Sequence, residues 1–150
     1  MIEILVVLTV VVLGIAAGAL IAEAFILVPM WRSMEASAFL AWYELNAERL
    51  LRFFGSLEVA ALLVPGLATA TSWFQETSGL AYLGLATGLS ILVLVSFPIY
   101  FRDANASFAQ GTIDLDDVPD ELRRWALWHR GRTLIALLAF IVSIMAAKAL

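Results

Sequence analysis

Four long apolar segments constrain this chain more than any other feature. A helix needs about 20 apolar residues to cross the hydrocarbon core of a bilayer. The four segments cover about residues 4–28, 57–73, 80–98 and 133–147. They explain why the sequence is 63% apolar and only 15% charged, whereas soluble domains are roughly 45–50% apolar. We therefore predict one all-α domain over residues 1–150, an integral membrane four-helix antiparallel bundle.

The positions of the arginines predict how the bundle is oriented. All eight arginines lie in the connections between the first and second spans and between the third and fourth, while the other side has only Lys148. Basic residues favour the cytoplasmic side. We expect a multi-pass protein of a bacterial-type inner membrane, with both termini outside and both long connections in the cytoplasm. The first segment has no basic flank, so we expect it to be retained rather than cleaved as a signal peptide.

Helical features continue beyond the spans on the arginine-rich side. Residues 37–54 place apolar and polar residues at helical spacing, and Asp117 followed by Pro119 predicts the start of a helix that runs into the last span. Pro98 is expected to kink or end the third span. We therefore predict that helices 2 to 4 extend on the cytoplasmic side. Trp31 falls where interfacial aromatic residues are common and is interpreted as a membrane anchor.

The composition also excludes several kinds of chemistry. There is no cysteine, which excludes disulfides, thiolate metal sites and a cysteine nucleophile. The net charge of −4 gives no reason to expect a nucleic-acid partner. The expected partners are the lipid bilayer and a hydrophobic small molecule, and a homo-oligomer stays open.

Ionisable groups inside the spans carry the main functional signal, because such groups are costly in lipid and normally face the interior of a bundle. A rise of about 1.5 Å per residue brings a polar group from each helix to one layer, roughly 24–30 Å from the outer surface. The groups at this layer are Glu23, Glu58, Tyr100 and His129. At or below it lie Arg52, Arg132 and Asn105. Trp125, one turn before His129, is expected to line the same cavity.

Three uses of this layer stay open on the residues alone. In the first, a carboxylate or the imidazole removes a proton from a substrate, while an arginine or Tyr100 steadies the anion. In the second, Glu23, Glu58 and His129 bind a metal, since two carboxylates and an imidazole suit iron, manganese or zinc. In the third, the acids pair with Arg52, Arg132 or His129 only to close the bundle. The cofactor requirement is accordingly none or a single metal ion.

One segment resembles a known family. The stretch Trp125-x-x-x-His129-x-x-Arg132-Thr133, which opens the last span, resembles the anthrone-oxygenase-like family of small four-span membrane proteins. The stretch FPIYFRDANASF, with Asn105, and the small-residue-rich GIAAGALIAEAFILVP of the first span are similar to that family as well. The resemblance implies a membrane-embedded four-helix bundle and oxidation of an anthrone, a polycyclic phenol, with molecular oxygen.

The resemblance also implies roles for individual residues. His129, Arg132 and Asn105 are the matching positions, and the depth of the spans adds Glu23 and Glu58. We expect Glu23 or His129 to be the base, Arg132 and Asn105 to orient the anion, and Glu58 to complete the pocket. The predicted function is an oxygenase-like oxidoreductase, an anthrone-oxygenase-like monooxygenase, acting on a hydrophobic aromatic or phenolic molecule. The alternative is a non-enzymatic membrane protein, namely a small-molecule binder, transporter component or assembly partner with a structural Glu–Arg–His network.

Overall fold

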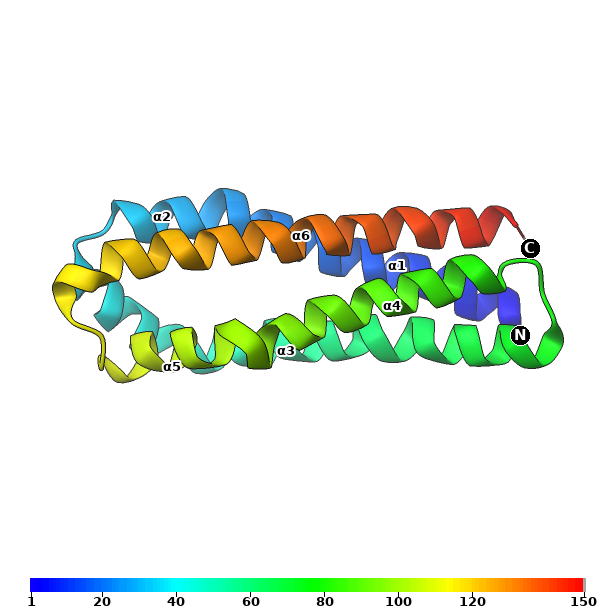
Figure 1. The fold of residues 1–150 in the computed structure, drawn as a ribbon, viewed down its shortest axis with the longest axis horizontal. Helices are drawn as coiled ribbons and strands as arrows, with labels where there is room; N and C mark the ends of the chain where they lie inside the picture. The colour runs from blue at the N-terminus through cyan, green and yellow to red at the C-terminus, as the bar shows by residue number, and fades with distance from the viewer. Residues whose placement is uncertain (150) are drawn as a thin grey trace.

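The computed structural model describes residues 1–149 as a long bundle of four antiparallel helical rods (Figure 1). All four rods are long and apolar enough to cross a membrane, and residues 1–149 contain no strand. The predicted all-α four-helix membrane bundle is therefore confirmed. The first rod consists of α1 (Ile2–Ala22), a π-helical turn η1 (Glu23–Leu27) and α2 (Val28–Ser33). The second is α3 (Ala36–Gln75). The third consists of α4 (Leu80–Ser96), a second π-helical turn η2 (Phe97–Phe101) and α5 (Arg102–Gln110), and the fourth of a 3-10 turn η3 (Leu115–Asp117) and α6 (Val118–Lys148).

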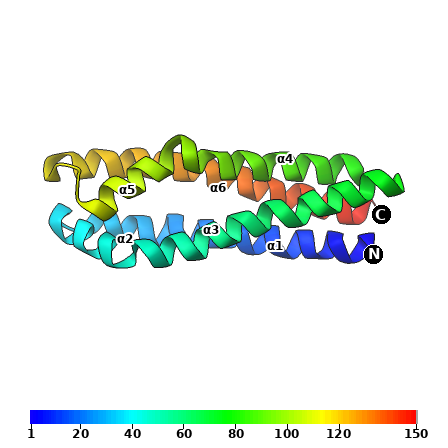
Figure 2. The ribbon, with the colours of Figure 1, turned by 90° about the horizontal axis from the view of Figure 1, so that it is seen from below.

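The rods are longer than a membrane is thick. The 40 residues of α3 extend over about 60 Å, roughly twice the hydrocarbon thickness of a bilayer. The two termini and the short turn between α3 and α4 lie at one end of the bundle, and the α2–α3 and α5–α6 connections lie at the other (Figures 1 and 2). We call this second end the arginine-rich end, because all arginines except Arg132 lie toward it. It extends well beyond a single membrane thickness.

The helix bounds differ from the predicted spans mainly at the arginine-rich end. The first rod continues past residue 28 to Ser33, whereas α6 begins at Val118, beside the start predicted from Asp117 and Pro119, and runs into the last span as expected. The third rod does not end at Pro98 but passes through the π-helical turn η2. Proline has no N–H and crowds the carbonyl four residues earlier, and a widened π turn accommodates such a disturbance. Asp117 occupies the predicted cap position of α6, although its side chain makes no capping hydrogen bond.

The distribution of side chains in the half of the bundle that holds the termini suits a lipid environment. Large apolar side chains point outward, among them Ile4, Val11, Leu63 and Leu138. The interior is instead built from small residues, with buried Ala16, Ala61, Ala86 and Ala139 packed together. Small residues allow helices to approach closely in a membrane, where lipid tails compete with any apolar contact. The apolar exterior and close-packed interior are those of a multi-pass membrane protein.

The arginine-rich end has an aromatic core. Trp31 is 1% exposed and its ring contacts those of Phe39, Trp42, Tyr43 and Trp125, with centroids 5.3–6.1 Å apart. The interpretation of Trp31 as a membrane anchor is therefore wrong. Because the rods continue past the membrane, this tryptophan finds aromatic partners on α3 and α6 instead of lipid headgroups. The core also includes Phe101 and Phe108 of the third rod, so it joins all four rods at this end.

Candidate functional site

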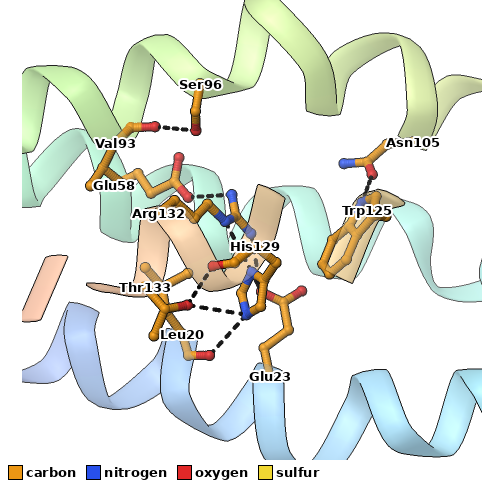
Figure 3. A network of polar contacts seen from close by, with 10 residues as sticks. All are labelled: Leu20, Glu23, Glu58, Val93, Ser96, Asn105, Trp125, His129, Arg132 and Thr133. Atoms are coloured by element: carbon orange, nitrogen blue, oxygen red, sulfur yellow. Dashed lines mark hydrogen bonds and ion pairs between the residues drawn. The ribbon is translucent and has the colours of Figure 1, made fainter. Parts of the chain in front are cut away.

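A guanidinium lies at the centre of the polar layer. Arg132 of α6 is 6% exposed and donates from Nη1 to Glu58 Oε1 at 2.9 Å and from Nη2 to Glu23 Oε2 at 3.1 Å (Figure 3). Its third donor, Nε, binds Nδ1 of His129 at 3.0 Å. We call Glu23, Glu58, His129 and Arg132 the buried cluster. It joins the first, second and fourth rods through one side chain.

Local helix geometry places each member of the buried cluster. Glu23 opens the π turn η1, Glu58 lies within α3, and His129 and Arg132 are three residues apart on α6, so that their side chains share a face. Glu23 and Glu58 are 4% and 8% exposed, and His129 is fully buried. The two carboxylates and the imidazole together accept from three of the five N–H groups of the guanidinium. Pairing of this kind is what makes charged groups tolerable away from water.

The hydrogen bonds of His129 define its tautomer. Arginine can only donate, so Nδ1 must accept the hydrogen bond from Arg132. The other ring nitrogen, Nε2, lies 2.9 Å from the carbonyl oxygen of Leu20, which can only accept. Nε2 therefore carries the hydrogen, and the imidazole is neutral. Glu23 Oε2 lies 3.6 Å from Nδ1, close enough to take over as its partner if Arg132 moves away.

Aromatic rings support the buried cluster from the arginine-rich end. The Arg132 guanidinium lies 4.1 Å from the ring centre of Phe101, a cation–π contact. Trp125 stacks on the His129 ring at 5.0 Å with 20° between the planes. Asn105 Oδ1 accepts a hydrogen bond from Trp125 Nε1 at 2.8 Å. Asn105 thus makes no hydrogen bond to the buried cluster but holds the tryptophan that stacks on the imidazole.

Two of the residues singled out in the sequence lie apart from the buried cluster. The Tyr100 hydroxyl donates to Glu121 at 2.6 Å, and its ring stacks on Trp128. Arg52 pairs with Glu48 on the surface of α3, where its side chain is 79% exposed. Both side chains leave their helices in directions that take them away from the buried cluster.

Two cavities flank the buried cluster. The larger has a volume of about 340 Å³ and lies between the first rod and α6, with His129 in its wall. Its lining residues are Ala24, Val28, Pro29, Arg32, Ser33, Ala126, His129 and Arg130. We call it the His129 cavity. The smaller, of about 20 Å³, lies in the apolar interior beside Glu58 and has room for a single water-sized molecule.

The three candidate metal ligands do not form a metal site in this arrangement. Within residues 1–149, no three His, Asp or Glu side chains are grouped so that they could hold a metal ion. Glu23, Glu58 and His129 each have a polar atom hydrogen-bonded to Arg132 instead. The position between the carboxylates is occupied by a cation that belongs to the chain itself.

Sequence reasoning missed the groups that complete the site from apolar or backbone positions. Phe101 beneath Arg132 and the carbonyl of Leu20 gave no polar signal in the sequence. Thr133 could have been found from the Trp–His–Arg–Thr segment, and its hydroxyl donates to the His129 carbonyl at 2.7 Å. Arg32 and Arg130 were counted for orientation only, yet both line the His129 cavity.

Comparison with known proteins agrees with the resemblance carried by the last span. No curated protein and no solved structure matches the chain. The family model described as anthrone oxygenase matches residues 39–142, which include most of α3, the whole third rod and the segment of α6 that holds His129 and Arg132. This match covers well over half of the chain. The chain belongs to the anthrone oxygenase family.

Proposed function

We propose that the protein is a membrane-embedded oxidoreductase that oxidises a hydrophobic aromatic or phenolic molecule with dioxygen. The observation that carries this proposal is the His129 cavity, a space of about 340 Å³ that has His129 of the buried cluster among its lining residues. Ligand pockets usually have volumes of about 300–1,000 Å³, and the volume of the His129 cavity falls in this range. Membership of the anthrone oxygenase family supports the same chemistry.

The proposed reaction needs a base and little else. A CH₂ group between an aromatic ring and a conjugated carbonyl system loses a proton to give a carbanion whose charge spreads onto oxygen. The carbanion adds dioxygen and takes back a proton, which gives a hydroperoxide. The hydroperoxide loses water and leaves a ketone. Overall, one CH₂ group and one O₂ give one C=O and one H₂O, with dioxygen as the oxidant.

In this proposal His129 is the base, and it requires a change of tautomer. Removal of a substrate proton by Nε2 needs that nitrogen free of hydrogen, with the ring proton on Nδ1. Glu23 Oε2, 3.6 Å from Nδ1, would then accept the Nδ1 hydrogen and stabilise the imidazolium that forms. Arg132, held by Glu58, would balance the charge of Glu23. Trp125, held by Asn105, is a positioning residue for the ring.

Glu23→Gln tests this proposal. The amide keeps the size of the side chain and can still accept from Arg132, so the fold should survive in detergent. It cannot stabilise an imidazolium, and general-base catalysis is typically worth about 10²–10⁴-fold. We expect turnover of a hydroxylated anthrone, followed by quinone absorbance and oxygen uptake, to fall at least about tenfold. Arg52→Gln is the control, because Arg52 lies outside the buried cluster, and the protein-free oxidation rate is subtracted throughout.

A structural, non-enzymatic role is the second candidate, and one specific observation favours it. Both nitrogens of His129 and all three nitrogens of Arg132 are already hydrogen-bonded within the chain. A fully paired network of this kind would close the bundle of a small-molecule binder, transporter component or assembly partner. In that case Glu23→Gln would lower the unfolding temperature and leave ligand binding and oxygen uptake unaltered.

A further inference from the structure

We infer that the ligand of the His129 cavity is an amphiphilic acid: an apolar, aromatic body that carries a carboxylate, bound by Arg32 and Arg130. The inference rests on the proposed function for the identity of the cavity as a substrate site. It adds a class of substrate and two binding residues outside the buried cluster.

The first support is the pairing of the arginines. Five of the eight have an acidic partner within ion-pair distance, and these are Arg52, Arg102, Arg123, Arg124 and Arg132. Among residues 1–149, Arg32, Arg49 and Arg130 have neither an ion pair nor a side-chain hydrogen bond. Two of these three line the His129 cavity. The cavity is therefore lined by two arginines, Arg32 and Arg130, that have no acidic partner in the described part of the chain.

The second support is the absence of acidic groups from the lining. The sequence has 13 acidic residues against nine basic ones, yet none of the eight residues that line the cavity is an aspartate or a glutamate. Two like charges around one concave space repel each other, and an anion between them removes that cost. The guanidinium group binds a carboxylate through two parallel hydrogen bonds, which makes it well suited to this ligand.

The third support is the remainder of the lining. Ala24, Val28, Pro29 and Ala126 give an apolar wall, and His129 is the one member of the buried cluster that borders the space. Arg32 follows Glu23 by nine residues, about 13 Å along a helix, toward the arginine-rich end. A ligand that spans this distance would place its acid near Arg32 and its apolar body near His129.

The test compares two probes of nearly the same size and shape, one charged and one neutral. Anthraquinone-2-carboxylate and anthraquinone-2-carboxamide are titrated into the purified full-length protein in a non-ionic detergent, and binding is followed by calorimetry. We expect the carboxylate to bind at least about tenfold more tightly than the amide, as one charge-assisted pair would give. The preference should disappear in Arg32→Gln/Arg130→Gln. Arg49→Gln is the matched control, because Arg49 is also unpaired but does not line the cavity, and it should keep the preference.

Three results would overturn the inference. Equal affinity for the two probes would show that the cavity does not select an acid. A preference that persists in the double variant would place the acid elsewhere. Displacement of the carboxylate by a few per cent of phosphatidylglycerol in the micelles, with no displacement by phosphatidylcholine, would make the cavity a lipid headgroup site.

Binding and oxygen-uptake measurements together distinguish failure of the proposed oxygenase activity from failure of the acid-binding site. A charge preference that depends on Arg32 and Arg130, without any oxygen uptake on a carboxylated anthrone, would support the acid site and remove the oxygenase activity. Equal turnover of neutral and carboxylated anthrones, together with equal binding, would overturn the acid site alone.

Discussion

The guanidinium of Arg132 and the carboxylate of Glu58 meet across the bundle interior, with 2.9 Å between Nη1 and Oε1 and neither side chain more than 8% exposed. They are 74 residues apart in the sequence and belong to α6 and α3. Glu23 approaches the same guanidinium from the first rod. Three of the four rods are thus linked through one cation, and the charge balance of the interior depends on it.

Loss of this cation should destabilise the bundle strongly. Arg132→Met leaves Glu23 and Glu58 buried without a partner, and breaking a buried pair typically costs about 3–5 kcal/mol. We expect a large fall in the unfolding temperature measured by circular dichroism in detergent. Arg52→Gln, which breaks an exposed pair, should change it little. Adding Glu23→Gln and Glu58→Gln to Arg132→Met should restore much of the loss, and failure of this rescue would contradict the charge argument.

The neutral tautomer of His129 can be observed directly. The chain has a single histidine, so its two ring nitrogens give unambiguous ¹⁵N signals in a labelled sample. We expect a protonated Nε2 and an unprotonated Nδ1 at pH 7, because Arg132 donates to Nδ1 and Leu20 accepts from Nε2. Two protonated nitrogens, or a protonated Nδ1 alone, would show that Arg132 does not donate a hydrogen bond to Nδ1.

The two buried tryptophans of the aromatic core should respond differently to loss of the indole N–H. The Trp31 Nε1 is buried without a hydrogen-bond partner in residues 1–149, whereas the Trp125 Nε1 donates to Asn105. Trp31→Phe therefore removes an unsatisfied donor along with some packing, and Trp125→Phe removes a hydrogen bond worth about 1 kcal/mol along with similar packing. Chemical denaturation in detergent should show the larger loss for Trp125→Phe. The reverse order would indicate that Trp31 has a partner after all.

Much of the fold follows from the sequence, because apolar length and arginine placement are properties of whole segments. Helical rise alone brought Glu23, Glu58 and His129 to one depth. It could not give the direction in which a side chain leaves its helix, so Tyr100 and Arg52 were expected in a layer from which they turn away. The sequence also could not predict that Arg132 lies between the two acids. Only the packing of three rods decides which cation takes that position.

The orientation of the bundle stays a prediction, and the lack of cysteine makes it simple to test. Ser78 lies in the exposed turn between α3 and α4, and Thr112 in the exposed loop between α5 and α6. With the arginine-rich end in the cytoplasm, Ser78→Cys should react with a membrane-impermeant maleimide on intact cells, and Thr112→Cys only after permeabilisation. The unsubstituted chain is the control because it has no thiol to label. The opposite labelling pattern would reverse the orientation.

The π turn η1 gives the first rod a place where the chain can change its length. A π turn holds one residue more than an α-helix does over the same path. Deletion of one residue between Glu23 and Leu27 could therefore convert η1 into a regular helix. The segments before and after it would keep their present faces toward the bundle interior. The helix α3 contains no π turn, so it cannot absorb the deletion of one residue in this way. Such a deletion would rotate everything beyond it by about 100° and swing Glu58 or its neighbours out of the interior.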